Sequence, residues 1–197
     1  GTKNLYQYIL KCREGGLDPK AQPRIVNEGP AWAIMYGNNA FGTATACKAM
    51  KLAIEKARAC GIGYVGVRDS CHFGAAGCYS NLAAMNGMIG LAMSNADPNM
   101  AVPNGSGMAI GNNPFSFAVP YKDDQTVFLD MALSNVAALK VIMAKEAGKQ
   151  VPNGWLVDKD GLPTNDPSDF PNTSFLLPVG AHKGYGLAVM VETLSAV

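Results

Sequence analysis

Apolar residues recur every three or four positions over residues 43–60, which is the clearest helical pattern in the chain. Cys47, Met50 and Ile54 share one face of this predicted helix, and charged residues occupy other positions. Similar patterns, together with glycine and proline breaks, predict the remaining elements. They are a helix over 5–12, strands over 31–36, 63–67 and 88–93, a helix over 75–86, strands over 115–119 and 126–129, and helices over 135–147 and from 182.

Strand, helix, strand, helix and strand follow one another over residues 31–93, an order typical of an α/β domain. The sequence therefore predicts the α/β class, with a mixed sheet flanked by helices. We expect residues 1–22 to be a segment of an N-terminal helical region and residues 23–197 to form the α/β domain. Two long stretches, 94–114 and 148–180, are rich in turn-forming residues and are predicted to be loops, which in compact domains often carry function.

Composition limits the classes of partner. Hydrophobic residues make up 48% of the chain and charged residues 16%, and the formal net charge is +1. The chain has no basic cluster that would attract nucleic acid, no apolar run of the roughly 18 residues that a membrane span needs, and no signal-type segment. We therefore expect neither nucleic acid nor a membrane as a partner. The cysteines include no CxxC pair, which argues against a disulfide framework or a zinc site and favours the cytoplasm.

One of the two histidines, His72, lies at a predicted strand-to-helix junction. The segment Asp69-Ser-Cys-His72-Phe-Gly74 follows the strand over 63–67 and precedes the next helix. Such junctions in α/β proteins present polar side chains to ligands, and an imidazole exchanges protons near neutral pH. Two other interpretations stay open. His72 could cap the helix or satisfy buried backbone groups, and the adjacent Cys71 could be the nucleophile of a hydrolase.

The string Gly61-Ile-Gly63-Tyr-Val-Gly66 matches the GxGxxG pattern of dinucleotide-binding proteins. That motif binds a pyrophosphate only where a strand precedes it and a helix follows it. Here a predicted helix precedes it and a predicted strand follows. We therefore interpret these glycines as a helix stop and a tight beginning of the strand. Any nicotinamide cofactor must bind without the usual Rossmann loop.

Three further polar residues lie at predicted element ends beside glycine-rich segments, namely Asn95, Asp130 and Lys183. The Asn95 amide could orient a ligand, and Asp130 could accept a hydrogen bond from a ribose hydroxyl or orient a histidine. Lys183 could meet a phosphate or carboxylate at the beginning of its helix, where the helix dipole favours anions. Each residue could also be a solvated charge or a loop cap. Their shared position at element ends predicts a common site with His72.

Taken together, these segments resemble the malate/L-lactate dehydrogenase family of oxidoreductases, which lacks the Rossmann fold. The family includes ureidoglycolate, sulfolactate and diketogulonate oxidoreductases and the piperideine-2-carboxylate reductases. The resemblance runs essentially from end to end, and its motifs are specific in this order and at these spacings. They are Gly37 to Gly42, Asp69-Ser-Cys-His72-Phe-Gly-Ala-Ala-Gly77, Asn95, Gly111-Asn-Asn-Pro114, Leu129-Asp-Met-Ala132, Pro152-Asn-Gly-Trp155 with Asp158, Asp166-Pro167, and Leu177-Pro-Val-Gly180 followed by Lys183-Gly-Tyr-Gly186.

The resemblance implies a non-Rossmann NAD(P)-binding fold of the sulfolactate dehydrogenase-like type. It implies hydride transfer, with NAD or NADP, between a small 2-oxo or cyclic imino acid and its 2-hydroxy or amino counterpart. It also implies a homodimer, and no metal. His72 would be the catalytic residue, and Asn4 and Gly74 would bind the substrate. The cofactor-binding residues would be Asn95, Asp130, Met131, Ala132, His182, Lys183 and Gly184.

Three positions depart from the family's pattern. The family carries a Ser-His-Gly motif whose histidine is the proposed proton donor; Gly1 matches its glycine, so the Ser and His would precede this chain. Asn4 replaces the arginine that pairs with the substrate carboxylate, and Asn112 stands where Thr is usual. The family also continues beyond Val197, and the chain lacks an initial Met, so we expect a fragment. A catalytically inactive remnant that binds a ligand or a partner is the alternative function.

Overall fold

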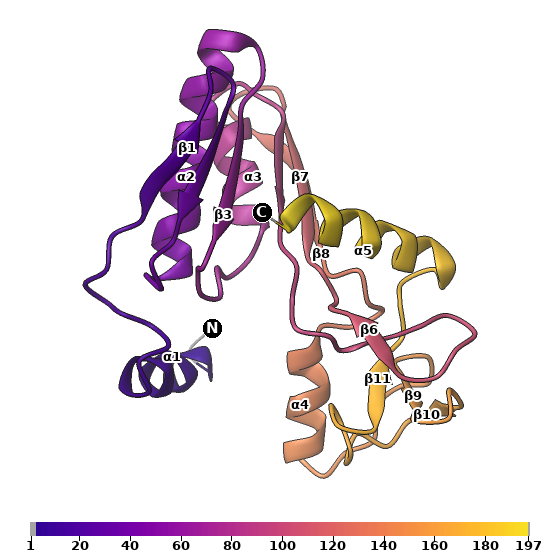
Figure 1. Ribbon diagram of the computed structural model, residues 1–197. Coiled ribbons are helices and arrows are strands. Elements are labelled where there is room, and N and C mark those ends of the chain that lie inside the picture. The colour runs from indigo at the N-terminus through magenta and orange to yellow at the C-terminus, as the bar shows by residue number, and fades with distance from the viewer. Residues whose placement is uncertain (1–2, 197) are drawn as a thin grey trace. The chain divides into compact units, whose positions relative to one another are not determined.

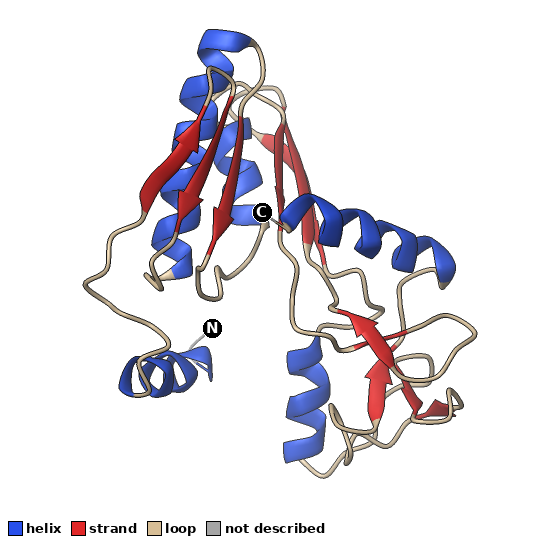
Figure 2. Cartoon of the chain, in the orientation of Figure 1, coloured by secondary structure: helices blue, strands red, loops and turns tan. Residues whose placement is uncertain are grey.

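The structure is a computed structural model that describes residues 3–196, and it combines helices with short strands in a mixed α/β architecture (Figures 1 and 2). The helices are α1 (Lys3–Arg13), α2 (Gly42–Cys60), α3 (Gly77–Ala84), α4 (Ala138–Glu146) and α5 (His182–Ser195). The strands are β1 (Arg24–Glu28), β2 (Trp32–Tyr36), β3 (Tyr64–Arg68), β4 (Gly90–Met93), β5 (Met100–Ala101), β6 (Met108–Ile110), β7 (Phe115–Pro120), β8 (Thr126–Met131), β9 (Leu156–Asp158), β10 (Pro163–Thr164) and β11 (Ser174–Leu176).

The described residues divide into two compact units, and each has its own packing. The first unit holds the residues up to Ala92 together with Ser116–Leu129. The second holds Met93–Phe115 and Asp130–Ala196. These divisions fall at other positions than the boundary expected after residue 22, which stays a prediction. None of the helices within residues 3–196 has both the length and the apolar character that a membrane crossing requires.

A three-stranded mixed sheet in the order β1-β2-β3 lies in the first unit, with α2 packed along it (Figure 1). β1 and β2 are antiparallel, whereas β2 and β3 are parallel. Ala33 and Met35 of β2 and Ile54 of α2 are buried, whereas Cys47 and Met50, predicted on the same face of α2, are only half-buried. The helix ends at Gly61, whose φ of 82° is the left-handed conformation that glycine adopts most readily.

The string that matches GxGxxG has the surroundings expected from the sequence, because α2 precedes it and β3 follows it. A side chain at Gly63 would place its Cβ 2.0 Å from the carbonyl oxygen of Ala53. Glycine is therefore required there for the close approach of the chain to α2 just before β3 begins. This glycine serves packing and not a pyrophosphate.

β1 differs from the prediction, in which its residues were an extended stretch between prolines. It is a strand at the edge of the sheet, and Val26 is its one half-buried residue. An edge strand that covers no core needs no alternation of apolar and polar residues, so its sequence carried no strand signal.

Another sheet, in the order β4-β7-β8, has most of its residues in the first unit, and α3 is joined to it by hydrogen bonds. The buried hydroxyls of Ser80 on α3 and Ser116 on β7 lie 2.6 Å apart, and Thr126 on β8 donates to the Asn81 side chain. The helix is shorter than the predicted span of 75–86, because a turn replaces its last residues before Gly87.

The second unit contains a five-stranded sheet in the order β10-β9-β11-β5-β6. The loops predicted over 94–114 and 148–180 are therefore corrected, since all five strands lie within them. Each strand is only two or three residues long, too short to show a period of two among so many glycines and prolines. Its buried apolar residues include one cluster with Val141 of α4 and Leu176, one with Met100 and Val191 of α5, and a smaller one with Ala101, Val157 and Phe175.

Candidate functional site

His72 lies in the loop that follows β3, at the carboxyl end of the parallel pair β2 and β3. This loop runs beside the loop after β2, where the Asn39 amide donates to the carbonyl of Asp69. A side chain at Gly42, the first residue of α2, would place its Cβ 2.0 Å from the carbonyl oxygen of Cys71. The loop is thus packed closely against the beginning of α2, and ends of parallel strands are common ligand sites.

Tyr8 on α1 contacts His72. Its hydroxyl oxygen lies 2.6 Å from Nδ1 of His72, and the two ring centroids are 5.9 Å apart. The edge of the Tyr8 ring packs against Phe41 at 6.2 Å, which helps to fix the phenol. Because Nδ1 is engaged by Tyr8, Nε2 is the ring nitrogen left for a ligand. Partial burial and the positive charge of Lys11 lower the pKa of His72, so the neutral imidazole predominates near pH 7.

A second tyrosine fixes the loop on the far side of His72. The Tyr79 hydroxyl donates to the carbonyl of Phe73, and the two rings are stacked with centroids 5.4 Å apart. Burial raises the pKa of Tyr79 to about 12, so this phenol stays protonated as a donor. His72 is therefore neither a helix cap nor a buried backbone partner. His72 is exposed, and its side chain is hydrogen-bonded to Tyr8.

The other first-unit candidates, Asn4 and Gly74, have simple surroundings. Asn4 is half-buried on α1, one helical turn before Tyr8, so the two residues share a face of that helix. Gly74 has a φ of 82° in the loop after His72. Cys71 is less suited to nucleophilic chemistry, because its Sγ donates to the backbone carbonyl of Gly16 at 3.3 Å. The thiol proton is thus directed to a carbonyl and not to a general base, which argues against the hydrolase interpretation.

All the residues assigned to a cofactor by resemblance belong to the second unit. The segment Gly111-Asn-Asn-Pro114 packs against the stretches of chain that follow Asn95 and Asp130. A Cβ at Gly111 would lie 2.3 Å from the carbonyl oxygen of Ala96, and the Asn112 carbonyl accepts a 2.8 Å hydrogen bond from the Leu133 amide. The structure thus brings the stretch after Asn95 and the stretch after Asp130 against one segment.

Asn113 is fully buried and joins the same segment to α5. Its Oδ1 accepts from the Ala96 amide at 3.0 Å, and its Nδ2 donates to the carbonyl of Ala188 at 2.9 Å and to Oε2 of Glu192 at 2.8 Å. The other carboxylate oxygen, Oε1, accepts from Nδ2 of Asn95 at 3.4 Å. A buried amide with every polar atom paired is a rigid connection, since leaving one of these groups unpaired is costly.

The beginning of α5 is fixed against the chain that leaves β8. The Val179 amide donates to the Leu133 carbonyl at 3.0 Å, and Met131 and Tyr185 pack in one apolar cluster. Gly184 is buried, and a Cβ there would lie 2.1 Å from the carbonyl oxygen of Val179. His182 and Lys183 are exposed at the first turn of α5, where the helix dipole favours anions. Asp130 is exposed too, within β8, where the sequence had placed it just beyond the strand.

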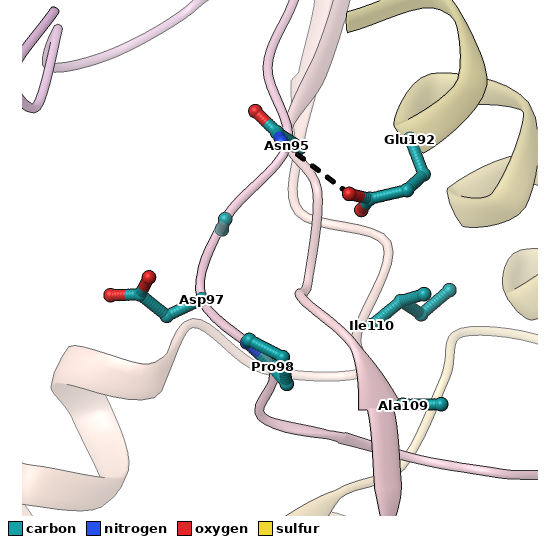
Figure 3. A pocket seen from close by; sticks show the side chains of 7 residues that line it. Asn95, Asp97, Pro98, Ala109, Ile110 and Glu192 are labelled. Carbon is teal, nitrogen blue, oxygen red and sulfur yellow. Dashed lines mark hydrogen bonds between the residues drawn. The ribbon is translucent and has the colours of Figure 1, made fainter. Parts of the chain in front are cut away.

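A pocket of about 300 Å³ opens beside Asn95 and Glu192 (Figure 3). Its lining consists of Asn95, Ala96, Asp97, Pro98, Ala109, Ile110 and Glu192. None of these described lining residues is basic, and two of them are carboxylates. The pocket is therefore suited to groups that donate hydrogen bonds and unsuited to phosphates.

A family model described as malate/L-lactate dehydrogenase matches residues 1–197. The chain belongs to the malate/L-lactate dehydrogenase family. It is 40% identical over 204 residues to the malate dehydrogenase of Pyrococcus abyssi, covering 100% of this chain and 56% of that protein. It is 36% identical over 198 residues to the ureidoglycolate dehydrogenase (NAD(+)) of Escherichia coli strain K12, again covering 100% and 56%. The chain thus spans little more than half the length of these relatives.

The fold agrees with the family assignment. The structure of sulfolactate dehydrogenase from Methanocaldococcus jannaschii is similar, with a TM-score of 0.89 and 40% identity, covering 100% of this chain and 57% of that one. The expected sulfolactate dehydrogenase-like α/β fold is thereby confirmed. The match to the family's Ser-His-Gly motif concerns Gly1, which lies outside the described residues, and the roles of the individual site residues stay predictions.

Three residues of this family member were missed by the sequence reasoning, namely Tyr8, Asn113 and Glu192. Asn113 lies in a quoted motif, but nothing in the motif shows that its side chain is buried. Tyr8 follows Asn4 by four residues in a predicted helix, a spacing that could have joined it to the site. Glu192 is the one acidic residue of α5, and a lone carboxylate among apolar residues is a signal for a buried partner.

Proposed function

We propose that the protein containing this chain is an NAD- or NADP-dependent oxidoreductase. It interconverts a small 2-oxo acid, or a cyclic imino acid, and the corresponding 2-hydroxy or amino acid. The observation that carries this proposal is the family match over the whole chain. The hydrogen-bonded pair of half-buried Tyr8 and exposed His72 adds chemical support, because a carbonyl reduction needs a proton for the forming alkoxide.

The role proposed for His72 is proton exchange at Nε2. In oxidation, the neutral imidazole carries its proton on Nδ1, which donates to the Tyr8 oxygen, and Nε2 accepts the proton of the substrate hydroxyl. In reduction, the protonated imidazole returns the Nε2 proton to the substrate oxygen and becomes neutral, while Nδ1 keeps its proton and its hydrogen bond to Tyr8. The Tyr8 oxygen thus holds the imidazole in the tautomer that leaves Nε2 for the substrate in both directions. Asn4, on the same face of α1, would offer an amide to the substrate carboxylate where an arginine would offer a charge.

The second unit fits a dinucleotide in several ways. Lys183 and the first turn of α5 are exposed and would hold phosphates. Asp130 would accept from a ribose hydroxyl, and Asn95 would contact the cofactor at the acidic pocket. Met131, Ala132, His182 and Gly184 complete the proposed cofactor residues. When bound, the cofactor supplies or accepts the hydride.

The resemblance also supports a cytoplasmic homodimer, and size-exclusion chromatography with light scattering would test the dimer. A single mass of one chain at micromolar concentration would contradict it.

The activity is tested with the complete gene product. NADH and NADPH oxidation would be followed with pyruvate, oxaloacetate, glyoxylate-derived acids and cyclic imino acids. We expect turnover with at least one acid and one cofactor. Cofactor binding without any turnover would favour the inactive remnant, and neither binding nor turnover would contradict the proposed function.

A further inference from the structure

A series of hydrogen bonds joins Ala96, Asn113, Glu192 and Asn95, and the chemistry of these groups fixes which of them donates in each bond. The Ala96 amide can only donate, so Asn113 must turn Oδ1 toward it and Nδ2 toward Glu192. A carboxylate can only accept, so Glu192 in turn requires Nδ2 of Asn95. Figure 3 shows the resulting orientation, with the Asn95 amide oxygen pointing away from the carboxylate.

We propose that Glu192 is a positioning residue for cofactor binding, which holds Asn95 with Oδ1 free as an acceptor at the pocket. The group that Asn95 recognises is then a hydrogen-bond donor of the cofactor, either the carboxamide NH₂ of the nicotinamide or a ribose hydroxyl. This inference rests on the proposed function. The lining supports it, because Asp97 and Glu192 disfavour phosphate and no described lining residue is basic.

The conservative variant Glu192→Gln reverses the orientation. Asn113 stays fixed by the Ala96 amide and continues to donate to the side-chain oxygen at position 192. The new NH₂ group then faces Asn95, which must rotate to accept from it and present its own NH₂ to the pocket. The side chain keeps its size, so packing is conserved while one acceptor becomes a donor.

The experiment measures the dissociation constants of NADH and NADPH by calorimetry, together with KM and kcat, in the complete protein. Glu192→Gln should weaken binding of the preferred cofactor roughly tenfold, the scale of one hydrogen bond, and raise the KM for that cofactor by a similar factor. Asn95→Ala should weaken it by a similar factor. The double variant should have a cofactor dissociation constant no higher than that of the single variant that binds the cofactor less tightly, because both changes remove the same acceptor. Glu55→Gln on α2 is the matched control, and thermal unfolding verifies folding.

The 3-acetylpyridine analogue, which lacks the amide NH₂, distinguishes the two donors. If the carboxamide is recognised, Glu192→Gln loses affinity for NADH but little for the analogue. If a ribose hydroxyl is recognised, it loses affinity for both equally. Unchanged dissociation constants in Glu192→Gln, or additive losses in the double variant, would overturn the inference. Either result leaves wild-type turnover, and with it the proposed function, standing.

Discussion

The two compact units differ in how they hold their candidate residues. In the first, His72 is an exposed side chain on a loop, with one hydrogen bond to Tyr8. In the second, Asn113 is fully buried, and its hydrogen bonds connect a loop to α5. A residue that exchanges protons must reach its ligand, whereas a residue that positions a loop does so best without water. We therefore predict that a change at His72 affects reaction rate, and that a change at Asn113 affects folding first.

The largest effect is expected at His72. In the complete protein, His72→Ala should lower turnover by roughly 10²–10⁴, the usual contribution of a general acid or base, while the cofactor dissociation constant stays within twofold. Steady-state rates and calorimetry would measure the two quantities. A rate within a few-fold of the parent would remove His72 from the chemistry and weaken the contrast between the units.

Asn113→Ala should have its main effect on stability. It leaves the Ala96 amide and the Ala188 carbonyl of the interior without their partner, which we expect to cost about 3 kcal/mol of unfolding free energy. Urea denaturation of this variant and of Asn112→Ala, whose residue is half-buried, would compare the two neighbours. Equal, small losses of unfolding free energy in the two variants would show that the buried Asn113 side chain does not stabilise the second unit.

Tyr8→Phe tests the phenol without removing the ring that packs on Phe41. Losing one hydrogen bond to His72 should lower turnover about tenfold, with little change in stability. Tyr6→Phe, on the same helix and exposed, is the control. If both variants kept full activity over the whole pH range, Tyr8 would have no part in proton transfer.

The smallest expected effect concerns the charge of Lys11, which together with partial burial lowers the pKa of His72. Oxidation of the hydroxy acid needs the neutral imidazole, so its rate should fall as pH drops through the pKa of His72, below 6.5. Lys11→Met should move this limb of kcat/KM toward higher pH, whereas Lys20→Met should not. A limb that does not move, or moves to lower pH, would contradict the assignment.

The lowered pKa of His72 also makes the folding stability depend on pH. A histidine whose pKa is lower in the folded protein favours folding fully above its unfolded pKa of about 6.5, and this contribution is lost as pH falls through the folded pKa.

The sequence predicted α2, β3 and the loop with His72 well, because α2 is a long amphipathic helix with a strong periodic pattern and β3 is a short run of mainly apolar residues that begins just after glycines. It did not predict β5, β6 or β9 to β11, which are too short to show a period. The candidate residues were predicted because they lie in motifs. Tyr8 and Glu192 lie in none of these motifs and were not predicted. Their importance comes from contacts over 64 and 97 positions of the chain, with His72 and Asn95, which no local pattern records.

Hydride transfer by the complete protein is tested most directly with NADH or NADPH that carries deuterium at both C4 positions of the nicotinamide. We predict that the hydroxy or amino acid formed carries this deuterium on C2, detected by mass spectrometry, and that His72→Ala forms the same labelled product far more slowly. A product without deuterium would contradict the account.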